Sequence, residues 1–235
     1  MLKIKVLLLF LLISNLYSGE IDKLKWTQTA NEDQIKIWDA PALKSGHVPV
    51  RGEVLIDGSM EKVLAVLSDT KNKPEWLTAL RKAKVIKDKS DYNRVEYYEV
   101  KMPTFLISDR TFSFEYDAVV NPKDKSVFVN IKSSDKYLKR NDKFVRANLR
   151  DSSMTIEYVV NKKGKKLVKV TGIFFTSPKG LIPNWVVTRF TRSLAKESLR
   201  KFREVVKKRK YPQTRIQEIA KLIEEYPSKG LALNK

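Results

Sequence analysis

The stretch that decides the fold is Thr176-Ser-Pro-Lys-Gly-Leu-Ile-Pro-Asn-Trp185, where a strand-rich region meets a helical one. Pro178 and Gly180 end the preceding strand pattern, and Pro183 suits the first turn of a helix, where a missing backbone N–H costs nothing. The next ~25 residues lack proline and glycine, which predicts one long helix. A sheet that ends in a long closing helix can enclose a cavity.

Working back from this junction, the chain reads as consecutive strands from about Val85 onward. Turn-like breaks fall at residues 87–93, 121–126 and 161–166. Between the breaks, apolar and polar residues alternate, which is typical of an antiparallel sheet with one dry and one wet face. The predicted inward rows are Phe112, Phe114, Tyr116 and Ala118; Val127, Val129 and Ile131; Val145, Ala147 and Leu149; Met154, Ile156, Tyr158 and Val160; and Val168, Val170, Gly172 and Phe174.

Earlier segments predict strands around Ile35–Ile37 and over 48–56, followed by two short helices. Residues 59–67 carry a helical apolar stripe, with Asp57 or Ser59 as the N-cap. Residues 69–73 read as a loop, and Pro74 opens a second short helix that reaches Leu80. The broad apolar face of the final helix comprises Val187, Phe190, Leu194, Leu199, Phe202, Val205 and Val206.

The two ends of the chain differ in character from its centre. Lys3 and Lys5 precede an apolar run over 6–13 and a small, polar stretch over 14–19, which predicts a signal peptide over 1–18. The protein is then exported, to a bacterial periplasm or the medium; an uncleaved membrane anchor is the alternative. Residues 20–210 form one domain, and 211–235 a C-terminal extension with a short helix and a disordered tail.

The composition limits the chemistry that the chain can perform. Its 47 basic and 27 acidic residues give a net charge of +20, which favours anionic partners such as a membrane surface. A basic, solvated face without a partner is the alternative. The aromatic residues fall on inward rows and the export signal is present, so nucleic acid is not expected as a partner. One histidine, His47, and no cysteine give no metal site, and no cofactor motif appears.

Several charged residues on the strands need separate consideration. Glu96, Glu99 and Glu115 are expected to point outward into solvent, because carboxylates are rarely buried without a partner. Asp109 and Arg110 are adjacent on a strand and therefore face opposite ways, so they are not expected to pair with each other. Arg110 is expected to pair with a carboxylate across the sheet; a place at the mouth of the cavity is its alternative role.

The chain from about Ile35 to Lys208 resembles the START lipid-transfer domains, which have a helix-grip fold. Four features carry the resemblance, in order: Asp69 followed by Pro74-Glu75-Trp76; Tyr97-Tyr98 through Pro103 to Ser108-Asp109-Arg110; Phe112 after that arginine; and Ser177 to Trp185 at the entry to the last helix. Thr111 departs from the family's Arg-Asp pair. Sterol-binding members resemble one another in a buried acid–arginine pair, and here its arginine falls near Tyr116, so sterol specificity is not carried over.

The resemblance implies an α+β fold in which a curved antiparallel sheet is closed by a long C-terminal helix. It also implies non-enzymatic binding, and possible transfer, of a lipid or other hydrophobic ligand. The protein is expected to be a monomer. One alternative is a helix-grip enzyme of the cyclase or hydrolase kind, which needs a polar group such as Glu96 or Tyr98 aimed into the cavity. The other is a basic envelope adaptor without a cavity. The predicted ligand-binding residues are Phe112, Phe114, Tyr116, Val129, Ile131, Met154, Ile156, Tyr158, Val170, Phe174, Val187, Phe190 and Leu194. Tyr98 and Arg110 are the polar candidates at the cavity mouth.

Overall fold

A computed structural model describes residues 23–90, 93–104, 107–138 and 144–208. The predicted signal peptide and the C-terminal extension lie outside the described residues. The strands are β1 (Thr27–Glu32), β2 (Ile35–Asp39), β3 (Val48–Ile56), β4 (Leu80–Asp88), β5 (Asn93–Val100), β6 (Arg110–Asn121), β7 (Ser126–Ser133), β8 (Val145–Arg146), β9 (Asn148–Val160) and β10 (Lys166–Ser177). The helical segments are α2 (Met60–Ser68), the 3-10 helix η1 (Thr70–Glu75) and α3 (Asn184–Lys208).

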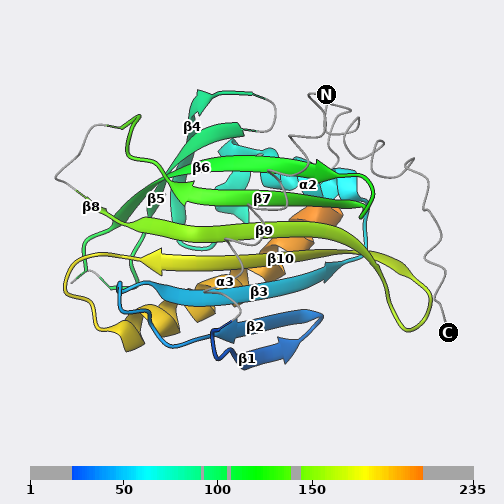
Figure 1. The fold of residues 1–235 in the computed structure, drawn as a ribbon, viewed down its shortest axis with the longest axis horizontal. Helices are drawn as coiled ribbons and strands as arrows, with labels where there is room; N and C mark the ends of the chain where they lie inside the picture. Colours follow the sequence, from blue (N-terminus) through cyan, green and yellow to red (C-terminus); the bar gives the residue numbers. More distant parts are fainter. Residues whose placement is uncertain (1–22, 91–92, 105–106, 139–143, 209–235) are drawn as a thin grey trace, which may run out of the picture.

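The strands form one curved sheet in the order β1-β2-β3-β10-β9-β7-β6-β5-β4, and neighbours on this path run antiparallel. The short strand β8 pairs with β6 in parallel. The sheet is open, with β1 and β4 at its edges. In Figure 1 the helix α3 crosses one face of the sheet, so the predicted helix-grip fold is confirmed.

The junction before α3 has the predicted role of ending one element and starting the next. Lys179 and Gly180 adopt positive φ angles of 55° and 78°, which turn the chain out of β10. The Pro183 carbonyl then accepts hydrogen bonds from the N–H groups of Val186 and Val187, at 3.0 and 3.3 Å. Helix α3 therefore begins at Asn184, directly after the proline, and runs to Lys208 as expected.

The first two helical segments match the prediction only in part. Helix α2 begins as expected, with the Ser59 hydroxyl accepting from the Lys62 N–H at 3.3 Å. The loop predicted over 69–73 and the helix predicted from Pro74 are wrong, because a 3-10 helix spans Thr70–Glu75 with Pro74 inside it. Ala79, at a φ of 67°, separates this segment from β4. The tight turn directs the Lys73 side chain into the protein interior.

The outward-facing side chains at the start of β6 are more buried than the alternation predicts. Thr111 and Ser113 were expected in solvent, but both are buried. The chain between β7 and β9 covers them: the Ala147 N–H donates to the Thr111 carbonyl at 3.0 Å, and the Ser134 N–H donates to the Ser113 carbonyl at 2.9 Å. A second difference concerns the N-terminal part, where the polar strand β1 pairs with β2 although its residues show no clear period.

The core has two parts on the inner face of the sheet. One part packs α2 and the C-terminal half of α3, through Phe202 and Val206, against β2, β3, β9 and β10. The other part lies under β5, β6 and β7 and includes Phe112, Phe114 and Ile131. The space between the sheet and the N-terminal half of α3 is not filled by either part.

Candidate ligand-binding cavity

An internal cavity of about 380 Å³ lies between the inner face of the sheet and α3. Its wall is mostly apolar and is built by strands β3 to β7, β9 and β10 together with α2, η1 and α3. The strands contribute alternate residues, and the helix contributes side chains at spacings of three and four, as the two periodicities require. The predicted residues that line the cavity are Phe112, Phe114, Tyr116, Val129, Ile131, Met154, Ile156, Val170, Phe174, Val187, Phe190 and Leu194.

One predicted residue, Tyr158, does not reach the cavity wall. Its hydroxyl accepts a hydrogen bond from the Met60 N–H at 3.2 Å, and the Lys166 ammonium lies 3.6 Å from its ring centroid. Tyr158 thus caps the start of α2 and packs against the core. The prediction of an inward row is correct as far as Tyr158 and wrong for Val160, which is 69% exposed, and the cavity ends before Tyr158 is reached. Ligand contact by the other residues stays a prediction.

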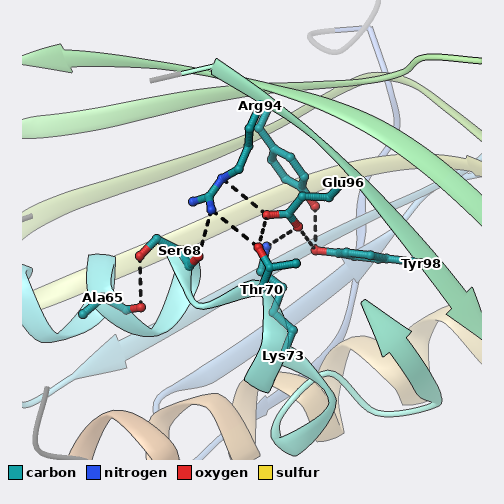
Figure 2. A network of polar contacts seen from close by, with 8 residues as sticks. Ala65, Ser68, Thr70, Lys73, Arg94, Glu96 and Tyr98 are labelled. Carbon is teal, nitrogen blue, oxygen red and sulfur yellow. Dashed lines mark hydrogen bonds and ion pairs between the residues drawn. The ribbon is translucent and has the colours of Figure 1, made fainter. Parts of the chain in front are cut away.

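The apolar wall is interrupted at β5 by a cluster of polar side chains, which Figure 2 shows from close by. Arg94, Glu96 and Tyr98 are alternate residues of β5 and all face inward, opposite Tyr116 and its neighbours on β6. Thr70 and Lys73 approach the same point from η1. Glu96 is fully buried and lies 2.6 Å from the Lys73 ammonium, whose side chain is 6% exposed. The cavity wall therefore contains a buried ion pair.

Four donors surround the Glu96 carboxylate. Oε1 accepts from the Thr70 hydroxyl at 2.5 Å and lies 3.4 Å from Arg94 Nε. Oε2 accepts from Lys73 and, at 2.7 Å, from the Tyr98 hydroxyl. Arg94 also donates to the Ser68 carbonyl at 3.0 Å, which ties β5 to the end of α2. Three hydrogen bonds and one ion pair thus occupy most of the roughly four lone-pair sites of the Glu96 carboxylate.

These contacts set the protonation states of the cluster. Burial alone raises the pKa of Glu96, but the Lys73 ammonium and the hydrogen bonds from Lys73 and Thr70 hold that pKa below its usual value. Burial lowers the pKa of Lys73, against the pull of Glu96. Burial also raises the pKa of both Tyr98 and Tyr116 well above 10. The 2.6 Å contact between Lys73 and Glu96 has the geometry of an ion pair, and the two tyrosine hydroxyl groups are neutral at neutral pH.

Arg110 lines the cavity from the first residue of β6 and is 3% exposed. The prediction that it pairs with a carboxylate across the sheet is wrong. Its guanidinium donates to the carbonyls of Pro178 at 2.9 Å and Lys179 at 3.1 Å, and also to that of Ser108. Asp109 turns the other way and pairs with Arg81 at 2.8 Å. Arg110 therefore links the start of β6 to the junction that precedes α3.

Sequence reasoning found Tyr98 and Tyr116, missed Lys73 and Arg94, and considered Glu96 as an inward group only for the enzyme alternative. Glu96 was expected in solvent, and that expectation is wrong. The available signal was the position of Glu96 on the row that also holds Tyr98, since alternate residues share a face. In the sterol-binding members the cation of the buried pair is an arginine, and the matching position here is near Tyr116, so no buried cation was expected. The structure supplies it instead as Lys73, whose ammonium lies 4.9 Å from the Tyr116 ring centroid.

Comparison with known proteins assigns the chain to a family. The START domain family matches residues 20–211, so the chain belongs to the START domain family. An uncharacterized protein of Pseudomonas aeruginosa, PA1579, is 22% identical over 78% of this chain and 88% of its own. No helix in the part of the chain that the structure describes is long and apolar enough to cross a membrane.

Solved structures share the fold. A STAR-related lipid transfer protein fragment from Xanthomonas axonopodis superposes with a TM-score of 0.66 at 22% identity, over 78% of this chain and 99% of that one. Human StAR-related lipid transfer protein 5 gives a TM-score of 0.71 at 16% identity, over 88% of this chain and 98% of that one. At these identities the similarity establishes the fold, and the ligand must be argued from the cavity itself.

Proposed function

We propose that the protein binds a lipid or other hydrophobic ligand non-covalently in the cavity and carries it without converting it. The observation that carries this proposal is the apolar cavity of about 380 Å³ between the sheet and α3. Burying a hydrocarbon there yields about 0.8 kcal/mol per CH₂ group. The volume lies near the low end of the roughly 300–1,000 Å³ typical of ligand pockets, which favours a single apolar body over a two-chain phospholipid.

An enzymatic function is less well supported by the polar groups of the cavity. An acid–base role for Glu96 calls for a raised pKa, but its pKa is held below the usual value and its lone pairs are occupied. His47, the only histidine in the sequence, is not among the residues that line the cavity. The adaptor alternative requires a filled core, which the cavity volume opposes.

The ligand would be exchanged at an anionic membrane surface by an exported, monomeric protein with residues 1–18 as its signal peptide. Support comes from the junction before α3. Leu181 is fully exposed and Trp185 is 70% exposed. The exposed Lys179 and Arg189 flank them, and the first turn of α3 carries no acidic residue. Pro178 and Ile182, in the same segment, line the cavity. A lipid surface that took up Leu181 and Trp185 would therefore lie next to the bound ligand.

Ligand binding is tested with the purified protein by native mass spectrometry, lipid extraction and uptake of a fluorescent lipid analogue. Val129 lies on the cavity wall and Val160 is 69% exposed at the end of β9. We expect Val129→Trp, which fills the cavity, to abolish uptake, and Val160→Trp to leave it unchanged. No co-purifying lipid and no saturable uptake of any analogue by the wild-type protein would refute the proposed function.

A further inference from the structure

The direction of the hydrogen bonds in the polar cluster carries information about the ligand. We propose that Tyr116 presents an acceptor to the cavity, and that the protein therefore prefers a lipid whose polar group donates a hydrogen bond, such as a hydroxyl or an amide N–H. This inference rests on the proposed function and adds the chemical class of the ligand. It follows from three steps along the chain of contacts Glu96–Tyr98–Tyr116.

The first step concerns Glu96, which can only accept hydrogen bonds in its ionised form. Its carboxylate accepts hydrogen bonds from Thr70, Lys73 and Tyr98, and the side chain, which also pairs with Arg94, has no exposed surface. A ligand in the cavity therefore cannot bond to the charge directly. The influence of Glu96 reaches the ligand only through the residues that surround it.

The second step concerns the single proton of each tyrosine hydroxyl. Tyr98 donates its proton to Glu96 Oε2 at 2.7 Å. The hydroxyl oxygens of Tyr98 and Tyr116 are 2.9 Å apart, so they also share a hydrogen bond. Because the Tyr98 proton is already used by a carboxylate, which is the stronger acceptor, Tyr116 must be the donor of this second bond. The proton of Tyr116 thus points toward Tyr98.

The third step concerns what remains available to a ligand. Tyr116 lines the cavity and is only half-buried, whereas Tyr98 is 4% exposed. With its proton committed, the Tyr116 oxygen offers a lone pair. A ligand donor adds one hydrogen bond to this chain. A ligand that only accepts must take the Tyr116 proton away from Tyr98, so it exchanges one hydrogen bond for another and gains none.

The two cations nearest to Tyr116, Lys73 and Arg94, are both paired with the Glu96 carboxylate, which reduces their attraction for an anionic headgroup. The Lys73 ammonium is paired with Glu96 and lies near the faces of both tyrosine rings, at 5.5 Å from the Tyr98 centroid and 4.9 Å from that of Tyr116. Arg94 donates to the Ser68 carbonyl and pairs with Glu96. Both cations are held by protein partners.

The test compares three probes with the same apolar body: 1-tetradecanol, its methyl ether and tetradecanoate. Their dissociation constants are measured by displacement of a fluorescent lipid from the full-length protein. We expect the wild-type protein to bind the alcohol more tightly than the ether, by roughly two- to tenfold, as one net hydrogen bond allows. Equal binding of alcohol and ether, or tighter binding of tetradecanoate than of the alcohol, would overturn the inference and leave the proposed function standing.

Two variants trace the preference to the hydrogen-bond chain. Tyr116→Phe removes the acceptor and should bring the alcohol-to-ether ratio close to one. Tyr98→Phe frees the Tyr116 proton and should improve binding of the ether relative to the alcohol. Tyr97→Phe is the matched control, because its hydroxyl contacts Glu99 and the residue does not line the cavity; it should keep the wild-type ratio. A ratio unchanged in both Tyr116→Phe and Tyr98→Phe would refute the role of Tyr116, and failure of the wild-type protein to bind any probe would refute the proposed function itself.

Discussion

Glu96 carries a charge although its side chain has no exposed surface, and Lys73 is the cation that compensates this charge. Removing one partner of a buried pair leaves the other charge uncompensated, which typically costs 3–5 kcal/mol. We therefore expect Glu96→Gln to lower the free energy of unfolding by about 3 kcal/mol, as measured by urea denaturation. Glu115→Gln removes a carboxylate from a more exposed pair with Lys89 and should cost less than about 1 kcal/mol.

The double variant Lys73→Met/Glu96→Gln separates pairing from packing. If the ion pair is the cause, this variant should lose less stability than the sum of the two single variants, because neither buried charge is left alone. Additive losses would contradict the pairing and would assign the effect of Glu96→Gln to its other hydrogen bonds, those from Thr70 and Tyr98.

The same carboxylate predicts how stability depends on pH. In the folded protein the pKa of Glu96 lies below the usual 4.5, so the unfolded chain binds a proton more readily in acid. The stability that Glu96 contributes is therefore complete above about pH 4.5 and is lost as pH falls through the folded pKa. Thermal melts from pH 7 to pH 3 should show a shallower acid decline for Glu96→Gln than for the wild-type protein. Parallel declines would contradict this assignment.

Single charged residues were the hardest feature to predict from the sequence. The alternation on β5 places Arg94, Glu96 and Tyr98 on one face, but three polar residues in a row are usually taken as the solvent face. Their burial depends on Lys73, which is distant in sequence and enters through η1. The segment η1 is held by tight turns and by packing against β4, so no periodic pattern in the sequence predicts it. The ion pair is thus a product of tertiary structure.

The long strands and the final helix were predictable because their apolar patterns extend over many residues. The rows of β6, β7, β9 and β10 and the full length of α3 follow from apolar alternation and from the prolines of the junction. The polar strand β1 has too few apolar residues to give a signal. The strand β8 lies at the start of the predicted row Val145, Ala147 and Leu149, but no sequence pattern predicts its parallel pairing with β6. What the pattern could not show is how the junction is held, which depends on Arg110.

The effect of Arg110 extends to a whole element, helix α3, because this side chain holds the turn that leads into the helix. Its three carbonyl partners lie on two segments, and lysine cannot reproduce that fork of donors. We expect Arg110→Lys to lower the free energy of unfolding by about 2 kcal/mol, since it removes hydrogen bonds made by a buried, charged donor. Hydrogen exchange should accelerate at residues 177–187, with β3 unaffected. Unchanged exchange at the junction would show that the prolines alone hold the turn.

At the scale of the whole molecule, the apolar rows and the closing helix indicated an enclosed space, but its size depends on how the side chains of β6, β9 and α3 meet. The net charge of +20 indicated an anionic partner without indicating which face would meet it. The exposed apolar side chains at the junction suggest that face, because basic residues occur throughout the sequence whereas Leu181 and Trp185 are two exposed, large apolar residues in one short segment.

Docking at this face predicts binding to vesicles of phosphatidylcholine and phosphatidylglycerol, measured by co-sedimentation. The variants Leu181→Glu and Trp185→Glu should each weaken binding about tenfold, because a charge replaces an apolar group that would enter the bilayer interface. Val160→Glu is the matched control: its wild-type exposure of 69% is close to the 70% of Trp185, and the β9–β10 hairpin lies at the opposite end of the sheet from the start of α3 (Figure 1).

Salt distinguishes the two contributions to docking, since it screens Lys179 and Arg189 but not apolar insertion. Binding of the wild-type protein should weaken between 0.05 and 0.5 M NaCl, roughly as the Debye length shortens, and should not vanish. Uptake of a lipid analogue from solution should be the same in Leu181→Glu as in the wild-type protein, because Leu181 does not line the cavity. Equal loss of vesicle binding in Val160→Glu would mean that net charge alone governs association, and the junction would then have no special part in it.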